Sequence, residues 1–133
     1  MNPHLFVYGS LLTTAGHAQG TRLRQEAVLL GPATVQGRLF RVTWYPALRP
    51  AVNPADRVHG ELYRLADVER SLAWLDEYEG LTPSQSSAAA GGEYLRLEKP
   101  VRLNDGSTLL AWLYEHQRAL PAAARVPDGI WRG

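Results

Sequence analysis

The chain contains no cysteine, which excludes disulfide bonds and thiolate chemistry. It also lacks any apolar run long enough to cross a bilayer, and its first residues do not have the basic segment and apolar core of a secretion signal. Its 14 basic and 13 acidic side chains are interspersed and leave a formal charge of +1. No charge tract therefore indicates a nucleic acid, a membrane or a strongly basic partner. We expect a cytoplasmic protein that binds neither nucleic acid nor membrane.

With 133 residues and no internal repeat, the chain is expected to fold as one domain over residues 1–133. Apolar and β-branched runs predict strands, and the Asn-Asp-Gly turn at 104–106 predicts a hairpin. The expected strands cover residues 5–8, 27–30, 34–42 and 58–65 and the two halves of 94–116. One principal helix is expected from an Asp67 cap to a stop at Gly80. These elements predict an α+β fold with a mixed, barrel-like sheet.

Several connections are expected to be irregular. The stretch TWYPALRPAVNPADR at 43–57 contains three prolines, which predicts an excursion without regular structure. The residues after the first strand are interpreted as a loop or a short helix, and Gly31-Pro32 is expected to separate two strands. Small and polar residues at 82–92 predict a mobile loop beside a pocket. The tail at 119–133 shows little pattern.

The expected helix ends in an acidic residue with an unusual position. An apolar stripe faces the core and is formed by Val68, Leu72 and Leu75. The same stripe reaches Glu79, whereas Glu77 points to the opposite side and Asp76 lies well off the stripe. A carboxyl held against apolar groups has a raised pKa and can carry protons near neutral pH. The alternative is that the helix end frays and Glu79 turns to solvent, and the spacing alone favours neither.

The first expected strand ends in an unusual turn, within the stretch LFVYGSLL at residues 5–12. A turn that faces water rarely needs two leucines after it, so we interpret this turn as part of a pocket. Gly9 can adopt backbone angles that other residues avoid, and it lets another group approach the chain closely. The pair Tyr45-Pro46 is either a second pocket wall or a rigid turn, and the sequence alone favours the turn.

The sequence does not contain the other catalytic and ligand-binding motifs that we considered. Ser10 is not a nucleophile elbow, because that motif needs a glycine where Leu12 stands. Gly9 is not followed by the Gly-Lys pair of a phosphate-binding loop. The four histidines have no metal-ligand spacing, and the four tryptophans are interpreted as core anchors. We therefore expect neither a metal nor a cofactor.

Five motifs follow one another along the chain, namely FVYGSL, YPAL, VHGELYRL, LDEYEG and YLR. Their order resembles the gamma-glutamylcyclotransferase-like family, within it the small bacterial branch related to gamma-glutamylamine cyclotransferases. The resemblance implies a small α+β fold around a mixed β-barrel with a pocket at its mouth. It also implies an enzyme without cofactor that cyclises a gamma-glutamyl amide or dipeptide and releases 5-oxoproline with a free amine or amino acid.

The resemblance assigns roles to particular residues. The amino-acid end of the substrate would be held, largely by backbone amides, at Tyr8, Gly9, Ser10 and Leu11. The expected substrate-binding set also includes three residues of the YPAL and YLR motifs, namely Tyr45, Pro46 and Tyr94. Glu79 would be the acid/base residue, and its nearest substitutes would be Asp76 or Tyr94.

Two interpretations compete with the enzyme. In a binding module for an amino-acid-like ligand, Glu79 would pair with the ligand's ammonium group instead of moving its proton. In a purely structural domain, Glu79 would be exposed or held in a salt bridge, with no cavity beside Gly9. We favour the enzyme over the module, and the module over the structural domain.

Overall fold

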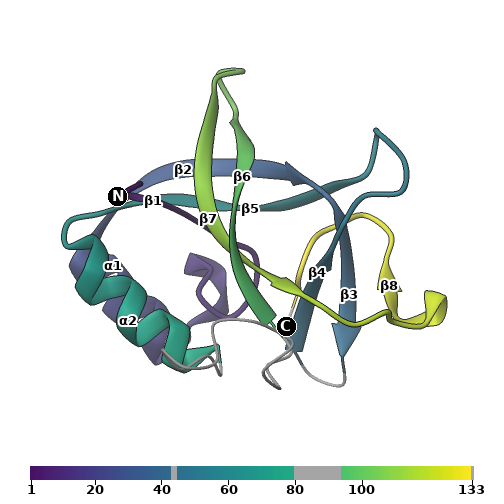
Figure 1. The fold of residues 1–133 in the computed structure, drawn as a ribbon, viewed down its shortest axis with the longest axis horizontal. Coiled ribbons are helices and arrows are strands. Elements are labelled where there is room, and N and C mark those ends of the chain that lie inside the picture. The colour runs from purple at the N-terminus through teal and green to yellow at the C-terminus, as the bar shows by residue number, and fades with distance from the viewer. Residues whose placement is uncertain (43–44, 80–93, 133) are drawn as a thin grey trace.

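The computed structural model describes residues 1–42, 45–79 and 94–132, which form two β-sheets and two α-helices (Figure 1). The strands are β1 (His4–Val7), β2 (Ala27–Gln36), β3 (Arg38–Val42), β4 (Tyr45–Arg49), β5 (Arg57–Leu65), β6 (Tyr94–Leu103), β7 (Thr108–His116) and β8 (Arg125–Val126). The helices are α1 (Ala18–Glu26) and α2 (Val68–Tyr78), with short 3-10 turns η1 (Thr13–Ala15) and η3 (Ala122–Ala124). This arrangement confirms the predicted α+β class.

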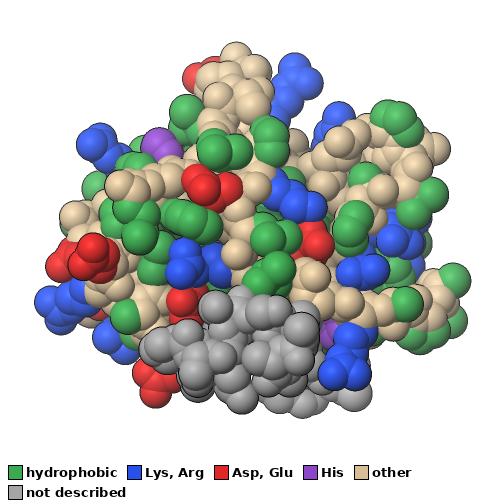
Figure 2. Space-filling view, viewed as in Figure 1, with side chains coloured by type: hydrophobic (Ala, Val, Ile, Leu, Met, Phe, Trp, Pro, Cys, Tyr) green, Lys and Arg blue, Asp and Glu red, His purple; other side chains and the backbone are tan. Residues whose placement is uncertain are grey.

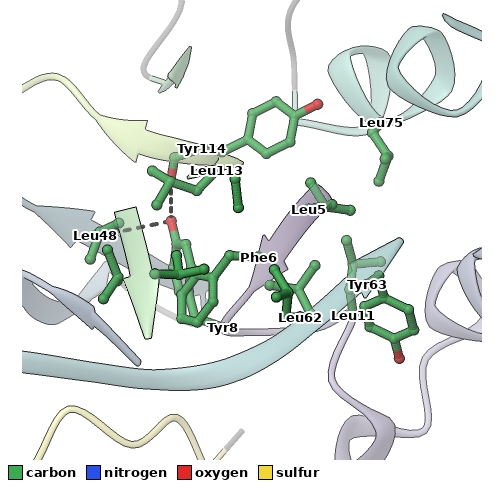
Figure 3. Close-up of a cluster of buried hydrophobic side chains, with 14 of the residues drawn as sticks. Leu5, Phe6, Tyr8, Leu11, Leu48, Leu62, Tyr63, Leu75, Leu113 and Tyr114 are labelled. Carbon is green, nitrogen blue, oxygen red and sulfur yellow. Dashed lines mark hydrogen bonds between the residues drawn. The ribbon is translucent and has the colours of Figure 1, made fainter. Parts of the chain in front are cut away.

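Five strands close into a barrel in the order β1-β5-β2-β6-β7. β1 runs parallel to β7, with Leu5 opposite Trp112, and the other pairs are antiparallel, so the barrel is mixed as predicted. Apolar side chains from its strands are almost wholly removed from solvent, among them Leu5, Phe6, Val58, Leu62, Val101 and Leu113. Figure 3 shows four of these side chains, Leu5, Phe6, Leu62 and Leu113, gathered in one cluster. Burial of this apolar surface is the main favourable contribution to folding.

A second sheet lies beside the barrel in the order β4-β3-β8, and it corrects one prediction (Figure 1). β4 forms within the proline-rich stretch that was expected to be irregular. It lies at the edge of this sheet, where Pro46 can be accommodated although it has no backbone N–H to donate. The C-terminal tail also contains structure, because Arg125 pairs with Phe40 of β3. Neither pairing leaves a local periodic signal.

The segment around Gly31 differs from the prediction as well. β2 continues through Gly31-Pro32, and the register against β5 shifts there in a bulge. Gly31 has a φ of 131°, a backbone angle that suits glycine, so the bulge forms without strain from a side chain. The interruption between strands falls instead at Gly37. The hairpin of β6 and β7 around residues 104–106 is confirmed.

Helix α2 forms as predicted. The Asp67 side chain caps it by accepting a hydrogen bond from the Arg70 N–H, and both Leu72 and Leu75 are buried. The predicted stop at Gly80 and the loop at 82–92 lie outside the described residues. A second helix, α1, packs beside α2 (Figure 1), and it confirms the short helix that was one of the two alternatives for the residues after the first strand. Glu26 of α1 joins the two, since it accepts hydrogen bonds from residues of α2.

Acidic and basic side chains are interspersed over the face shown in Figure 2. Within the described part of the chain, neither helix is long and apolar enough to cross a membrane.

Candidate active site

A cavity of about 410 Å³ opens where β1 ends, between the start of β4 and the last turn of α2. Its lining includes every residue that the sequence nominated for the site: Tyr8, Gly9, Ser10, Leu11, Tyr45, Pro46, Glu79 and Tyr94. Ser10 and Tyr78, which are far apart in the sequence, are joined here by a hydrogen bond of 2.6 Å between their hydroxyls. The structure thus brings the two nominated segments to one cavity, whereas the roles of the residues remain predictions.

Position 9 must be glycine because the side chain of Pro46 occupies the space that a Cβ atom would need. A Cβ atom on Gly9 would lie 2.3 Å from Cγ of Pro46, far inside van der Waals contact. Gly9 is not among the described glycines with positive φ, so its conformation does not explain the glycine. The expectation that Gly9 adopts special backbone angles was wrong, and on the side of its missing Cβ the group that approaches is Pro46. Tyr45 and Pro46 both line the cavity and belong to β4, so this pair is a pocket wall within a strand and not a turn.

The turn after β1 lines the cavity and contains backbone N–H groups that have no partner among the described residues. Leu12 donates its N–H to the Gly9 carbonyl at 3.0 Å, which closes the turn. Within the residues that the structure describes, no hydrogen bond uses the N–H groups of Ser10 and Leu11. Glu61 of β5 anchors the following residue, because its carboxylate accepts hydrogen bonds from both the N–H and the hydroxyl of Thr13. The turn is therefore held by hydrogen bonds that leave the N–H groups of two cavity-lining residues, Ser10 and Leu11, without a described partner.

Two of the nominated tyrosines have their hydroxyls engaged by the backbone. The Tyr8 hydroxyl donates to the Tyr114 carbonyl at 2.6 Å and accepts from the Leu48 N–H at 3.3 Å (Figure 3). The Tyr94 hydroxyl donates to the Pro46 carbonyl at 2.7 Å. These contacts join β1 to β4 and β7, and β6 to β4. Both residues therefore present mainly their rings to the cavity, and the backbone positions the phenols.

Glu79 lies at the C-terminal end of α2, where its N–H still donates to the Leu75 carbonyl at 2.9 Å. Burial raises the pKa of its carboxyl from the usual 4.5 to about 7, and the negative charge of Asp76 contributes to the shift. Among the described residues, no cation forms a salt bridge with this carboxyl. Glu79 therefore faces the cavity as predicted, as a group that exchanges its proton close to neutral pH.

Asp76 is joined to a residue of the cavity, although its distance from the apolar stripe gave no sign of this. Its Oδ1 accepts hydrogen bonds from Nε of Arg96 at 2.7 Å and from the Tyr114 hydroxyl at 2.6 Å. Tyr114 also lines the cavity. Burial and the Asp76 charge raise the pKa of Tyr114. The LDEYEG motif marks Asp76, but its partners on β6 and β7 carry no such signal.

Three further cavity residues escaped the sequence analysis. Tyr78 lines the cavity next to Glu79, and the His17 ring lies 5.7 Å from the Tyr78 ring between centroids. Trp131, from the tail without pattern, is buried and closes another side. Tyr78 could have been found as the neighbour of Glu79 in LDEYEG. No sequence signal marks His17 or Trp131, which reach the cavity only through the fold.

The described residues contain no group of three or more His, Asp or Glu side chains arranged to hold a metal ion.

Several solved structures have the same fold. YkqA from Bacillus subtilis is 21% identical with a TM-score of 0.71, and the match covers 98% of this chain and 40% of that chain. An AIG2-like protein from Mus musculus is 23% identical with a TM-score of 0.64, covering 90% of this chain and 80% of that chain. A structure named gamma-glutamyl cyclotransferase is 20% identical with a TM-score of 0.62, covering 86% and 66%. The TM-scores show that these proteins share the fold of this chain, and at such low sequence identities they show the fold alone.

The present chain thus spans well under half the length of YkqA. No curated protein is a significant sequence match. At the level of families, residues 5–133 match the one described as gamma-glutamyl cyclotransferase, AIG2-like. Because this match extends over nearly the whole sequence, the chain belongs to the gamma-glutamyl cyclotransferase, AIG2-like family.

Proposed function

We propose that this protein cyclises a gamma-glutamyl amide or dipeptide, releasing 5-oxoproline and a free amine or amino acid, with Glu79 as the general acid/base. The family relationship supports a cyclotransferase activity in general. The observation that carries the more specific proposal is the position of Glu79. Its carboxyl, with a pKa of about 7, lies in the same cavity as the glycine-containing turn after β1. A base with a pKa near the working pH is the most effective proton carrier.

The reaction needs a proton carrier and little else. The α-amine of the substrate attacks its own γ-carbonyl carbon, a new C–N bond closes the five-membered ring, and the original amide C–N bond breaks. Two protons leave the α-ammonium group and two reach the departing nitrogen, so Glu79 can pass each one and finish unchanged. Attack within one molecule already has a high effective molarity, provided that the substrate is held folded.

The turn after β1 supplies what the carbonyl oxygen needs. Negative charge develops on this oxygen while the amine attacks, and the N–H groups of Ser10 and Leu11, which have no partner among the described residues, would donate to it. The rings of Tyr8, Tyr45 and Tyr94, together with Pro46, would bound the substrate and exclude water. Exclusion of water strengthens the interaction of these donors with the oxyanion.

The test is an assay of 5-oxoproline release from a panel of gamma-glutamyl amines and gamma-glutamyl dipeptides. We expect release from at least one substrate, and a loss of about 10²- to 10⁴-fold in rate for Glu79→Gln. Glu77→Gln is the matched control, because Glu77 is exposed and lies two residues away on the same helix. Near wild-type turnover by Glu79→Gln would show that another group is the base. Ligand binding without release from any substrate would favour a binding module.

A further inference from the structure

We propose that Asp76 is a positioning residue for this site, held next to the cavity residue Tyr114 by Arg96 and by Tyr114 itself, so that it controls proton transfer by Glu79. The inference rests on the proposed role of Glu79 and adds a second carboxylate that does not touch the substrate. Its basis is a hydrogen-bonded cluster that joins the end of α2 to β6 and β7.

The orientation of the Asp76 carboxylate is fixed by three hydrogen bonds. Arg96 donates through Nε to Oδ1 at 2.7 Å and through Nη2 to Oδ2 at 3.2 Å, and the Tyr114 hydroxyl donates to Oδ1 at 2.6 Å. Arg96 is itself held, since its guanidinium lies 4.6 Å from the centre of the Trp112 ring. A two-pronged contact of this kind restricts both side chains to one geometry. The negative charge of Asp76 therefore has a defined place beside the cavity.

Asp76 and Glu79 are three residues apart at the end of one helix, a spacing at which Cβ atoms are about 5–6 Å apart, so the two side chains are neighbours. A second negative charge at that distance opposes ionisation of Glu79. Among the described residues, the other ionisable groups that line the cavity with Glu79 are His17, whose ring lies beside that of Tyr78, and five tyrosines: Tyr8 of β1, Tyr45 of β4, Tyr78 of α2, Tyr94 of β6 and Tyr114 of β7. Arg96 forms an ion pair with Asp76, and its positive charge partly offsets the effect of the Asp76 charge on Glu79. Among these neighbours, Asp76 supplies the negative charge that acts on Glu79.

Asp76 also controls a proton donor. The Tyr114 hydroxyl donates its hydrogen bond to Asp76, although Tyr114 lines the same cavity as Glu79. A phenol free to rotate could donate to the Glu79 carboxylate and favour its ionised form. By engaging this proton, Asp76 removes a competing donor and leaves the phenol oxygen as an acceptor. The charge of Asp76 and its hydrogen bond thus act in the same direction, toward a Glu79 that holds its proton.

The test measures the midpoint of Glu79 titration in the ligand-free protein, by NMR of ¹³C-labelled glutamate carboxyls with the signal identified by its loss in Glu79→Gln. We expect Asp76→Asn to lower this midpoint by about 1 pH unit, the size expected for a neighbouring like charge that is partly offset by the charge of Arg96. Arg96→Gln should raise it, because Asp76 then loses the cation that offsets it. Glu77→Gln, an exposed change on the same helix, should leave it unchanged.

The opposite signs for Asp76→Asn and Arg96→Gln separate control of the proton from a purely structural role, because loss of packing in either variant would not produce them. If Asp76→Asn does not fold, the upward shift in Arg96→Gln still tests the proposal. An unchanged or raised midpoint in folded Asp76→Asn, or a lowered one in Arg96→Gln, would overturn it. The titration needs no substrate, so an absence of 5-oxoproline release would count against the proposed reaction alone. With an active substrate, the acid limb of kcat/KM should move with the same signs.

Discussion

Replacing Glu79 with glutamine should make the protein more stable above neutral pH while removing the base that we propose for the reaction. The two side chains have nearly the same shape, so packing at the end of α2 is retained. What changes is the charge: the native carboxyl lies against apolar and aromatic groups with no described salt-bridge partner. Its ionised form is therefore a cost to the folded state that glutamine does not carry.

The size and pH range of this effect follow from the two pKa values. The folded state holds the Glu79 proton up to about pH 7, whereas the unfolded chain releases it near 4.5. The folded state thus binds more protons between these values, and the free energy of unfolding falls as pH rises through that window. The shift corresponds to at most about 3 kcal/mol, since each tenfold change in proton affinity is about 1.36 kcal/mol. Below pH 4.5 the carboxyl is neutral in both states and the penalty is absent.

Urea unfolding of the wild type and of Glu79→Gln from pH 4 to pH 9 measures the difference directly. We expect the gain in unfolding free energy to be smallest at pH 4, to grow between 4.5 and 7, and to level off above pH 8. Glu77→Gln should give a curve nearly parallel to the wild type. Parallel curves for Glu79→Gln as well would refute the reasoning, because they would mean that Glu79 titrates in the folded protein as it does in the unfolded chain.

Three further changes test how the fold supports the cavity. Tyr8→Phe should cost about 1–3 kcal/mol in urea unfolding, because it leaves the buried Leu48 N–H and Tyr114 carbonyl without their partner; an unchanged midpoint would show that these groups find other partners. Asp67→Ala should cost about 1 kcal/mol through loss of the α2 cap, and Asp67→Asn should keep most of it. Gly60→Ala should cost about 1–3 kcal/mol in thermal unfolding, since the added Cβ would lie 2.1 Å from a carbonyl oxygen of β1.

Local sequence patterns were sufficient to predict the elements that carry their own turn or cap residues. The hairpin at 104–106 and the capped helix after Asp67 each carry a turn or cap residue beside a periodic apolar run. The same helical period placed Glu79 on the inward face, where the structure puts it. Helix α1 was harder to predict, because its apolar pattern is weak and its cap is His17, a residue seldom used in that role.

Elements that depend on distant partners could not be predicted in this way. β4 forms because β3 offers a pairing edge, and β8 consists of two residues that add to the other side of β3. The Asp76 cluster likewise depends on Arg96 and Tyr114, which reach it only once β6 and β7 have paired. The charge that acts on Glu79 is therefore defined by the closed barrel, although the helix alone indicates where Glu79 points.

Gly9 shows how a correct expectation can rest on a different cause. Its position after a buried strand predicted a close approach to the backbone, and the structure has one, but the approaching group is Pro46. Pro46 can come this close because Gly9 has no side chain, and the contact seats β4 against the turn. Tyr8 strengthens the same junction by accepting a hydrogen bond from the Leu48 N–H. The YGSL and YPAL motifs are thus two halves of one cavity wall. A Gly9→Ala variant would push this wall apart before it met any ligand, so its effect on activity would report the geometry of the turn and not a lost contact with substrate.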